Sequence, residues 1–171
     1  MAADVTIQEW NGTSGAEVAT DKTTGGTIRF KKADNALVNS ADPMPKPASG
    51  QVERSMLKYY RLHMGATGPS GSITDVRFYT TGNMGTGMTE YILTTNPGSY
   101  ATPTVPANDT GATDASTYTS GSPKNMGDGP YTTTNADFGD WAALYAKRAD
   151  TAVGPGVTPS NQTNVWQWSE T

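Results

Sequence analysis

Residues 52–80, VERSMLKYYRLHMGATGPSGSITDVRFYT, contain the clearest strand pattern of the chain. Apolar residues of the first run recur at every second position, as a pleated strand requires. The members of this apolar face are Tyr60, Leu62 and Met64. In the second run, Val76 and Phe78 share a face in the same way. The glycines and the proline of residues 65–71 break both runs, so the stretch predicts an antiparallel strand pair with a reversal or crossover between its members.

Weaker runs of the same kind flank this stretch. Residues 26–32 (GTIRFKK) alternate apolar and basic side chains. Residues 88–95 (MTEYILTT) and residues 164–168 (NVWQW) also have strand character. Only 35% of the 171 residues are hydrophobic, and 19 Gly, 11 Pro and many Thr favour extended chain and turns over helices. The sequence therefore predicts one all-β domain.

Residues 137–150 (DFGDWAALYAKRAD) are compatible with two interpretations. Their alanine content and the spacing of Phe138, Trp141 and Leu144 favour a helix. Read at a period of two, the same residues form a strand that is buried on both faces. We favour the strand, because sheet context commonly overrides local propensity.

Residues 1–25 are polar apart from one short alternating patch, and we expect an extended N-terminal arm with a strand near residues 6–10. Residues 26–171 are expected to form a single domain of the β-sandwich class. Three prolines within residues 43–47 predict an extended connector, since proline fixes φ and lacks a backbone donor. Residues 96–135 are rich in Thr, Gly, Pro and Ser and predict a long surface loop.

Isolated aromatic residues of the arm and the loop are candidate contacts for a partner. They are Trp10, Tyr100, Tyr118 and Tyr131. Tyrosines spaced through Gly and Ser are typical of contact surfaces, because each ring supplies a large rigid area at a small entropy cost. The alternative for each of these side chains is that it packs against the body of its own domain.

The sequence offers no constellation for catalysis or metal binding. It has no Cys, and His63 is its only histidine, so neither a thiolate site nor a histidine-based triad or metal cluster can form within one chain. The carboxylates are scattered, and Asp128, Asp137 and Asp140 lack the ligand density of a calcium loop. We therefore expect no enzyme activity, no metal and no cofactor.

The net charge of −4 argues against a nucleic-acid partner, which would need clustered Lys and Arg. No stretch reaches the length of a membrane span, and the first ten residues lack the features of a signal peptide. We expect a protein made in a cytoplasm, with neither nucleic acid nor membrane as a partner.

Several segments together resemble the capsid decoration (cement) proteins of tailed bacteriophages and related small virion structural proteins. They are PMPKPASG (43–50), RSMLKYYRL (54–62), ITDVRFYT (73–80), TGNMGTG (81–87), SYATPT (99–104) and NVWQWSE (164–170). The resemblance covers residues 26–171 and implies an antiparallel sandwich or jelly-roll body without an active site.

The resemblance further implies a protein of the virion surface that bridges subunits of the major capsid protein, often as a homotrimer. The long loop and the arm would make the contacts. An alternative is a tail or neck component, which would rely on the same kinds of contact and has no sequence feature that separates it from a decoration protein. Another alternative is a carbohydrate-binding, host-recognition module, in which Trp10, Trp166 or Trp168 and loop tyrosines would stack on sugar rings and must be exposed.

Overall fold

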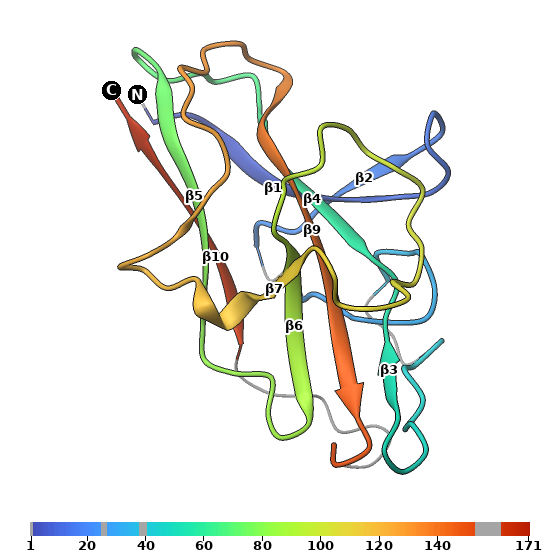
Figure 1. The fold of residues 1–171 in the computed structure, drawn as a ribbon. Coiled ribbons are helices and arrows are strands. Elements are labelled where there is room, and N and C mark those ends of the chain that lie inside the picture. The colour runs from blue at the N-terminus through green and yellow to red at the C-terminus, as the bar shows by residue number, and fades with distance from the viewer. Residues whose placement is uncertain (1, 25–26, 38–40, 153–161) are drawn as a thin grey trace.

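The structure, a computed structural model, describes residues 2–24, 27–37, 41–152 and 162–171. Two antiparallel sheets pack face to face, so the predicted all-β sandwich is confirmed (Figure 1). The strands are β1 (Val5–Asn11), β2 (Val18–Asp21), β3 (Val52–Arg54), β4 (Lys58–Met64), β5 (Ile73–Thr81), β6 (Met88–Leu93), β7 (Ala112–Asp114), β8 (Lys124–Asn125), β9 (Ala136–Ala149) and β10 (Thr163–Glu170). A short 3-10 helix, η1 (Ala115–Thr117), follows β7.

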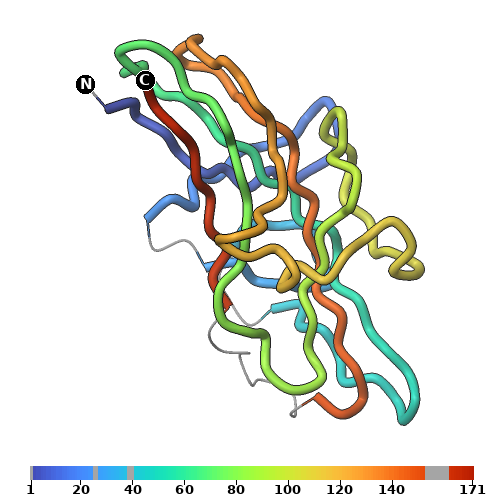
Figure 2. Tube along the Cα trace, turned by 60° about the vertical axis from the view of Figure 1, so that its left-hand side comes forward, coloured from blue at the N-terminus to red at the C-terminus, as the bar shows by residue number. Residues whose placement is uncertain are grey.

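The large sheet has the strand order β2-β1-β4-β9-β6-β7, with β3 paired to the far end of β9. The small sheet has the order β10-β5-β8. The two chain ends lie side by side at one end of the sandwich, where the backbone N–H of Ala3 donates to the Glu170 carboxylate at 3.0 Å (Figure 2). Among the described residues, no helix is long and apolar enough to cross a membrane.

The two runs of residues 52–80 are strands, but they do not pair with each other. Strand β4 lies between β1 and β9 in the large sheet, whereas β5 lies between β10 and β8 in the small sheet. The expected pairing of the two runs is therefore wrong, and of the two expected connections, a reversal or a crossover, residues 65–71 form the crossover between the sheets. Both edges of β4 and of β5 are paired with strands from distant parts of the sequence. The local alternation of side chains does not show which strands these are.

The faces of these strands follow the sequence pattern. The main core lies between the sheets and joins residues of β4, β5, β6 and β9. Its buried members are Tyr60, Leu62, Met64, Ile73, Val76, Phe78, Ile92, Ala115, Met126, Phe138, Ala142 and Leu144. Ile73 and Val76 are both buried although their parity differs, because a bulge opposite Trp168 shifts the register of β5. Asp75 sits at this bulge with a φ of 53°, in the left-handed region.

Residues 136–149 form β9, the central strand of the large sheet, so the strand interpretation of this segment is confirmed (Figure 1). Its alanines face neighbours on both sides: Ala142 joins the main core and Ala143 the opposite face. Small side chains let both faces be covered closely. Gly139 has a φ of +69°, and a Cβ there would lie 3.0 Å from the Met126 carbonyl oxygen, so the bulge in β9 requires glycine.

Three expectations need correction. The expected strand near residues 6–10 is present as β1, but it is hydrogen-bonded to β4 from Val5 to Trp10 and to β2, so residues 5–21 are no arm outside the sheet. Residues 27–32 contain no strand, only an isolated bridge between Lys31 and Pro43, and Gly26 lies outside the described residues. Residues 96–135 are not a bare loop, because they contain β7, η1 and β8.

Candidate functional site

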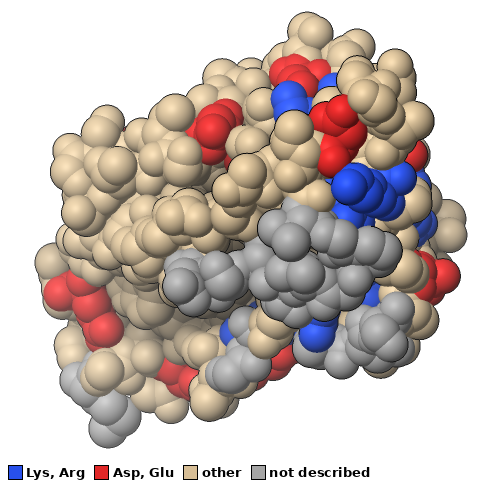
Figure 3. Space-filling view, turned by 90° about the horizontal axis from the view of Figure 1, so that it is seen from below, with Lys and Arg blue, Asp and Glu red and all other residues tan. Residues whose placement is uncertain are grey.

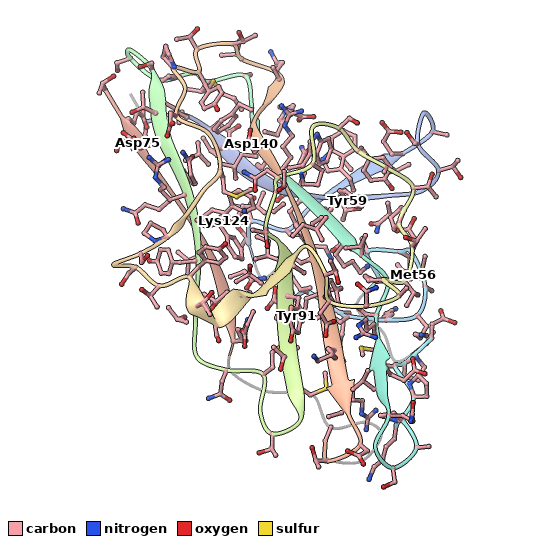
Figure 4. All side chains as sticks on the ribbon, viewed as in Figure 1. Met56, Tyr59, Asp75, Tyr91, Lys124 and Asp140 are labelled. Carbon is pink, nitrogen blue, oxygen red and sulfur yellow. The ribbon has the colours of Figure 1, made fainter. Side chains whose placement is uncertain are left out.

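Trp10 and Tyr100, two of the predicted contact residues, lie on the outer face of the large sheet. They pack with Tyr59, Trp141 and Ala143 in a second core, which we call the outer aromatic cluster. The rings of Trp10 and Trp141 meet edge to face at a centroid distance of 5.5 Å. The Tyr100 hydroxyl donates to the Gly12 carbonyl at 2.6 Å. Both candidates therefore fasten segments of their own chain; Tyr59, on β4, is labelled in Figure 4.

Tyr118 and Tyr131, the other two candidates, pack against the main core. Lys124 lies over the Tyr118 ring at 5.7 Å, and the Tyr131 and Phe138 rings are 5.3 Å apart. Every aromatic residue of the chain lies in the described part, and each one is buried or half-buried. The structure therefore presents no platform of exposed rings.

Buried charges gather between the sheets at the edge formed by β1 and β4. Glu9 and Lys58 are each 1% exposed, and the Lys58 Nζ lies 2.8 Å from the Glu9 Oε1. The Tyr60 hydroxyl donates to the Glu9 Oε2 at 3.0 Å, and the Lys22 Nζ lies 3.5 Å from the same oxygen. We call these four residues the Glu9 cluster. Burial and the Glu9 charge raise the pKa of Tyr60 well above its ordinary value.

The Glu9 cluster also holds residues 31–37 across the end of the sandwich. Lys58 donates to the Asn35 carbonyl, and Lys22 donates to the Ala36 carbonyl at 2.8 Å. Asp34 accepts from the side chain of Asn11 at 2.8 Å. The carboxylate is engaged by two ammonium groups and a phenol, which leaves it suited to clamping chain segments rather than to taking a substrate proton.

A second buried carboxyl, Glu90 on β6, lies in the same inter-sheet space and is 3% exposed. It accepts hydrogen bonds from the side-chain amides of Gln162 and Asn164. Burial is the main reason that the pKa of Glu90 is raised to about 7. The Asp114 charge raises this pKa further, and the Asn164 hydrogen bond lowers it.

A cavity of about 120 Å³ lies beside these groups. Its lining is Ile7, Lys22, Ile28, Tyr60, Leu144, Thr163, Asn164 and Trp166. The volume is enough for a few water molecules and small for an organic substrate, since ligand pockets are typically about 300–1,000 Å³.

The outer face carries a third polar group around Asp109. Its Oδ1 lies 2.7 Å from the Arg54 Nε and accepts from the Tyr145 hydroxyl at 3.0 Å. Its Oδ2 lies 2.7 Å from the Lys147 Nζ. The Arg54 hydrogen bond is the main reason that the pKa of Asp109 is well below its ordinary value. Lys147 also lies over the ring of Tyr91, labelled in Figure 4, so this Asp109 clamp ties residues 96–111 to β9 and β6.

The single histidine pairs with a carboxylate near the upper end of β4. The His63 Nδ1 lies 2.7 Å from the Asp137 Oδ1, across the β4–β9 ladder. No cluster of three or more His, Asp or Glu residues suited to a metal ion occurs among the described residues. Two of the carboxylates that lacked the ligand density of a calcium loop in the sequence have separate partners: Asp128 accepts from Asn125, and Asp140 accepts from Asn96.

The β1–β2 hairpin and the loop before β7 meet on one side of the molecule. The Ser14 backbone N–H donates to the Thr102 hydroxyl at 2.9 Å, and Tyr100 reaches Gly12 as described above. Val18 of the hairpin is 66% exposed and Val105 of the loop 40%. We call residues 12–19 and 101–108 the hairpin–loop surface; their backbones lie close together (Figure 1), and Val18 and Val105 are exposed on them.

The sequence-based analysis missed Glu9, Lys58, Glu90 and Asp109. For the first three a signal exists: each charge stands at the same parity as the apolar residues of its strand, as Lys58 does before Tyr60. A charged residue at such a position must find a buried partner. Asp109 carries no such signal, because its partners come from β3 and β9.

No family model, no curated protein and no solved structure matches the chain.

Proposed function

We propose that the chain is a non-enzymatic structural protein of a tailed-bacteriophage virion, which decorates the capsid and stabilises it by bridging subunits of the major capsid protein. The resemblance of its sequence segments to decoration proteins suggests the role, and a homotrimer as the assembled form. One structural observation supports it best: the polar clusters join distant segments of the chain to one another. Glu9 joins β1 to β4, and Asp109 joins residues 96–111 to β3 and β9.

The Glu9 cluster and the Asp109 clamp favour a rigid folded chain. The Asp109 clamp and the Tyr100 hydroxyl hold the loop on the sheet, and Ser14 links the loop to the hairpin. A surface that is already ordered loses little conformational entropy when it binds, so more of its contact energy appears as affinity. We propose that the hairpin–loop surface is the face that contacts the major capsid protein.

The charge distribution agrees with a protein partner. On the face shown in Figure 3, acidic and basic side chains are interspersed and neutral residues cover most of the described surface. The carbohydrate-binding alternative is less well supported, because stacking on sugar requires exposed rings and every aromatic side chain is at least half-buried or packed.

The test is attachment to capsids. Purified protein is mixed with shells of the encoding phage that lack it, and the bound fraction is measured by sedimentation. We expect saturable binding at a fixed number of copies per shell. Charged substitutions on the proposed face, Val18→Asp and Val105→Asp, should lower affinity by tenfold or more.

The matched control is Val52→Asp, which alters a valine that is 42% exposed on β3, outside the proposed face. It should bind like the unaltered protein. Absence of binding to any shell would contradict the proposed function. Binding that survives both substitutions would leave the function standing and refute the assignment of the face.

A further inference from the structure

Glu90 is placed where it can join the two sheets. It lies on the inner face of β6, opposite Ala146 of β9, while its hydrogen-bond donors come from the start of the small sheet's β10. The Gln162 Nε2 donates to its Oε2 at 2.5 Å, and the Asn164 Nδ2 donates to its Oε1 at 2.7 Å. This carboxyl therefore connects residues that are more than 70 positions apart, as the two separations of 72 and 74 show.

No cation offsets a negative charge at this position among the described residues. Glu90 forms no ion pair there, whereas Glu9, the other buried glutamate, forms two. The Lys22 ammonium on the cavity wall is directed to Glu9 and to the Ala36 carbonyl. A buried carboxylate without a cation is costly unless it takes up a proton.

The remaining titratable groups around Glu90 do not supply that cation. Asp114 on β7 adds a like charge, and Tyr60 on β4 faces it as a neutral phenol. Arg148 lies two residues along β9 from Ala146 and donates its Nη1 to the Met44 carbonyl. The neighbours therefore favour the neutral carboxyl.

Asn164, a partner of Glu90, has a hydrogen-bond acceptor without a donor. The Asn164 Oδ1 is buried and has no hydrogen-bond donor, although the Nδ2 of the same amide already binds Glu90. An unpaired buried acceptor destabilises the folded state, because it has lost its hydrogen bonds to water without gaining another donor. A proton on the Glu90 carboxyl supplies the missing donor, because a carboxylic acid and an amide can form two hydrogen bonds side by side, one in each direction.

We propose that Glu90 is a proton-operated clasp that fastens the start of β10 to the large sheet. In the closed state the carboxyl carries a proton taken from solvent, donates it to the Asn164 Oδ1 and accepts from the Asn164 Nδ2. Loss of that proton to solvent leaves Asn164 half-paired and places a negative charge between the sheets. The cavity beside Asn164 gives water a place next to the exchanging group.

The direction of the pH effect follows from the raised pKa of Glu90, about 7 against an ordinary 4.5. The folded clasp binds the proton more tightly than an opened one, so its stabilisation is fully present below pH 4.5. It is lost as the pH rises toward 7 and stays lost above that value. Between those limits the opened population of β10 should grow by up to about tenfold per pH unit.

Hydrogen exchange followed by mass spectrometry tests the clasp. After correction for the intrinsic pH dependence of exchange, peptides covering residues 162–171 should lose roughly tenfold to hundredfold protection between pH 5 and pH 8. Glu90→Gln, which keeps a neutral side chain of the same shape, should remove this dependence. The control Glu53→Gln, in a half-exposed ion pair with Lys32, should keep it.

A second measurement needs no variant. Carbon NMR of the glutamate carboxyls in the unaltered protein should show one that titrates near pH 7. The clasp is refuted if every glutamate titrates below about pH 5, or if the unaltered protein and Glu90→Gln have parallel exchange profiles. A Glu90→Gln chain that fails to fold leaves the NMR titration to decide.

Discussion

Replacing Glu9 by Gln should destabilise the fold far more than removing a charge from the surface. The substitution keeps the shape of the side chain and leaves the Lys58 ammonium, 1% exposed, without its carboxylate at 2.8 Å. Removing one partner of a buried ion pair typically costs about 3–5 kcal/mol. Lys22 and the Tyr60 hydroxyl lose their acceptor charge as well, so we expect the upper part of that range.

The assay is equilibrium urea unfolding of the purified protein, followed by tryptophan fluorescence. The matched control is Glu53→Gln, whose pair with Lys32 has side chains 30% and 33% exposed and should contribute less than about 1 kcal/mol. For a chain of this size, a loss of 3–5 kcal/mol corresponds to a fall in Tm of roughly 6–20 °C. If both substitutions cost less than about 1 kcal/mol, the Glu9 cluster does not stabilise the fold and the reasoning is wrong.

Three further predictions concern other parts of the molecule. Trp141→Ala should cost about 3–5 kcal/mol in urea unfolding and open residues 96–111 to proteolysis, because the ring packs against Trp10, Tyr59 and Tyr100. Asp109→Asn should flatten the acid limb of a plot of stability against pH: the pKa of Asp109 is lowered by folding, so its stabilisation is present above its ordinary value of 3.8 and is lost as the pH falls below it. Deleting residues 1–11 should abolish the cooperative urea transition, since it removes β1 from the large sheet; a deleted chain that unfolds like the full one would show that β1 is dispensable.

The sequence carries enough information to locate most strands and to orient their faces. Alternation placed Tyr60, Leu62 and Met64 on one side of β4, and all three lie in the main core. The all-β context of the chain favoured β9 as a strand against its helical propensity. Alternation cannot say which strand lies beside which, because ladder hydrogen bonds join backbone groups and are nearly independent of side-chain type. Hence the β4–β5 pair was expected where a crossover occurs.

The N-terminal segment shows why a local estimate of burial fails. Its alternating patch offers only Val5, Ile7 and Trp10, whose burial alone is too small to offset the entropy of ordering the segment. The segment is ordered because Glu9 finds Lys58 and Tyr60 on β4, and because its backbone completes ladders on both sides. Neither contribution is apolar, and the two Glu9 contacts reach residues 49 and 51 positions away.

The loop aromatics could not be assigned from sequence for a related reason. A tyrosine in a Gly- and Thr-rich segment has the same local pattern whether its ring faces solvent or its own sheet. The Tyr100 ring faces its own sheet, because Trp141 and Ala143 on the outer face of β9 form an apolar surface that the loop covers. Such a surface is evident only once β9 is known to be a strand whose other face is already buried.

A chain with only 35% hydrophobic residues must cover both faces of its large sheet by other means as well. Two clamps add polar contacts, one at Glu9 between the sheets and one at Asp109 on the outer face. Fully paired charges, buried at Glu9 and partly buried at Asp109, add little net stability over apolar packing, but they penalise every arrangement that separates the partners. The hairpin and the loop are therefore restricted to one position rather than merely attached. That restriction is what a protein needs if it must present the same contact surface in many copies on a regular shell.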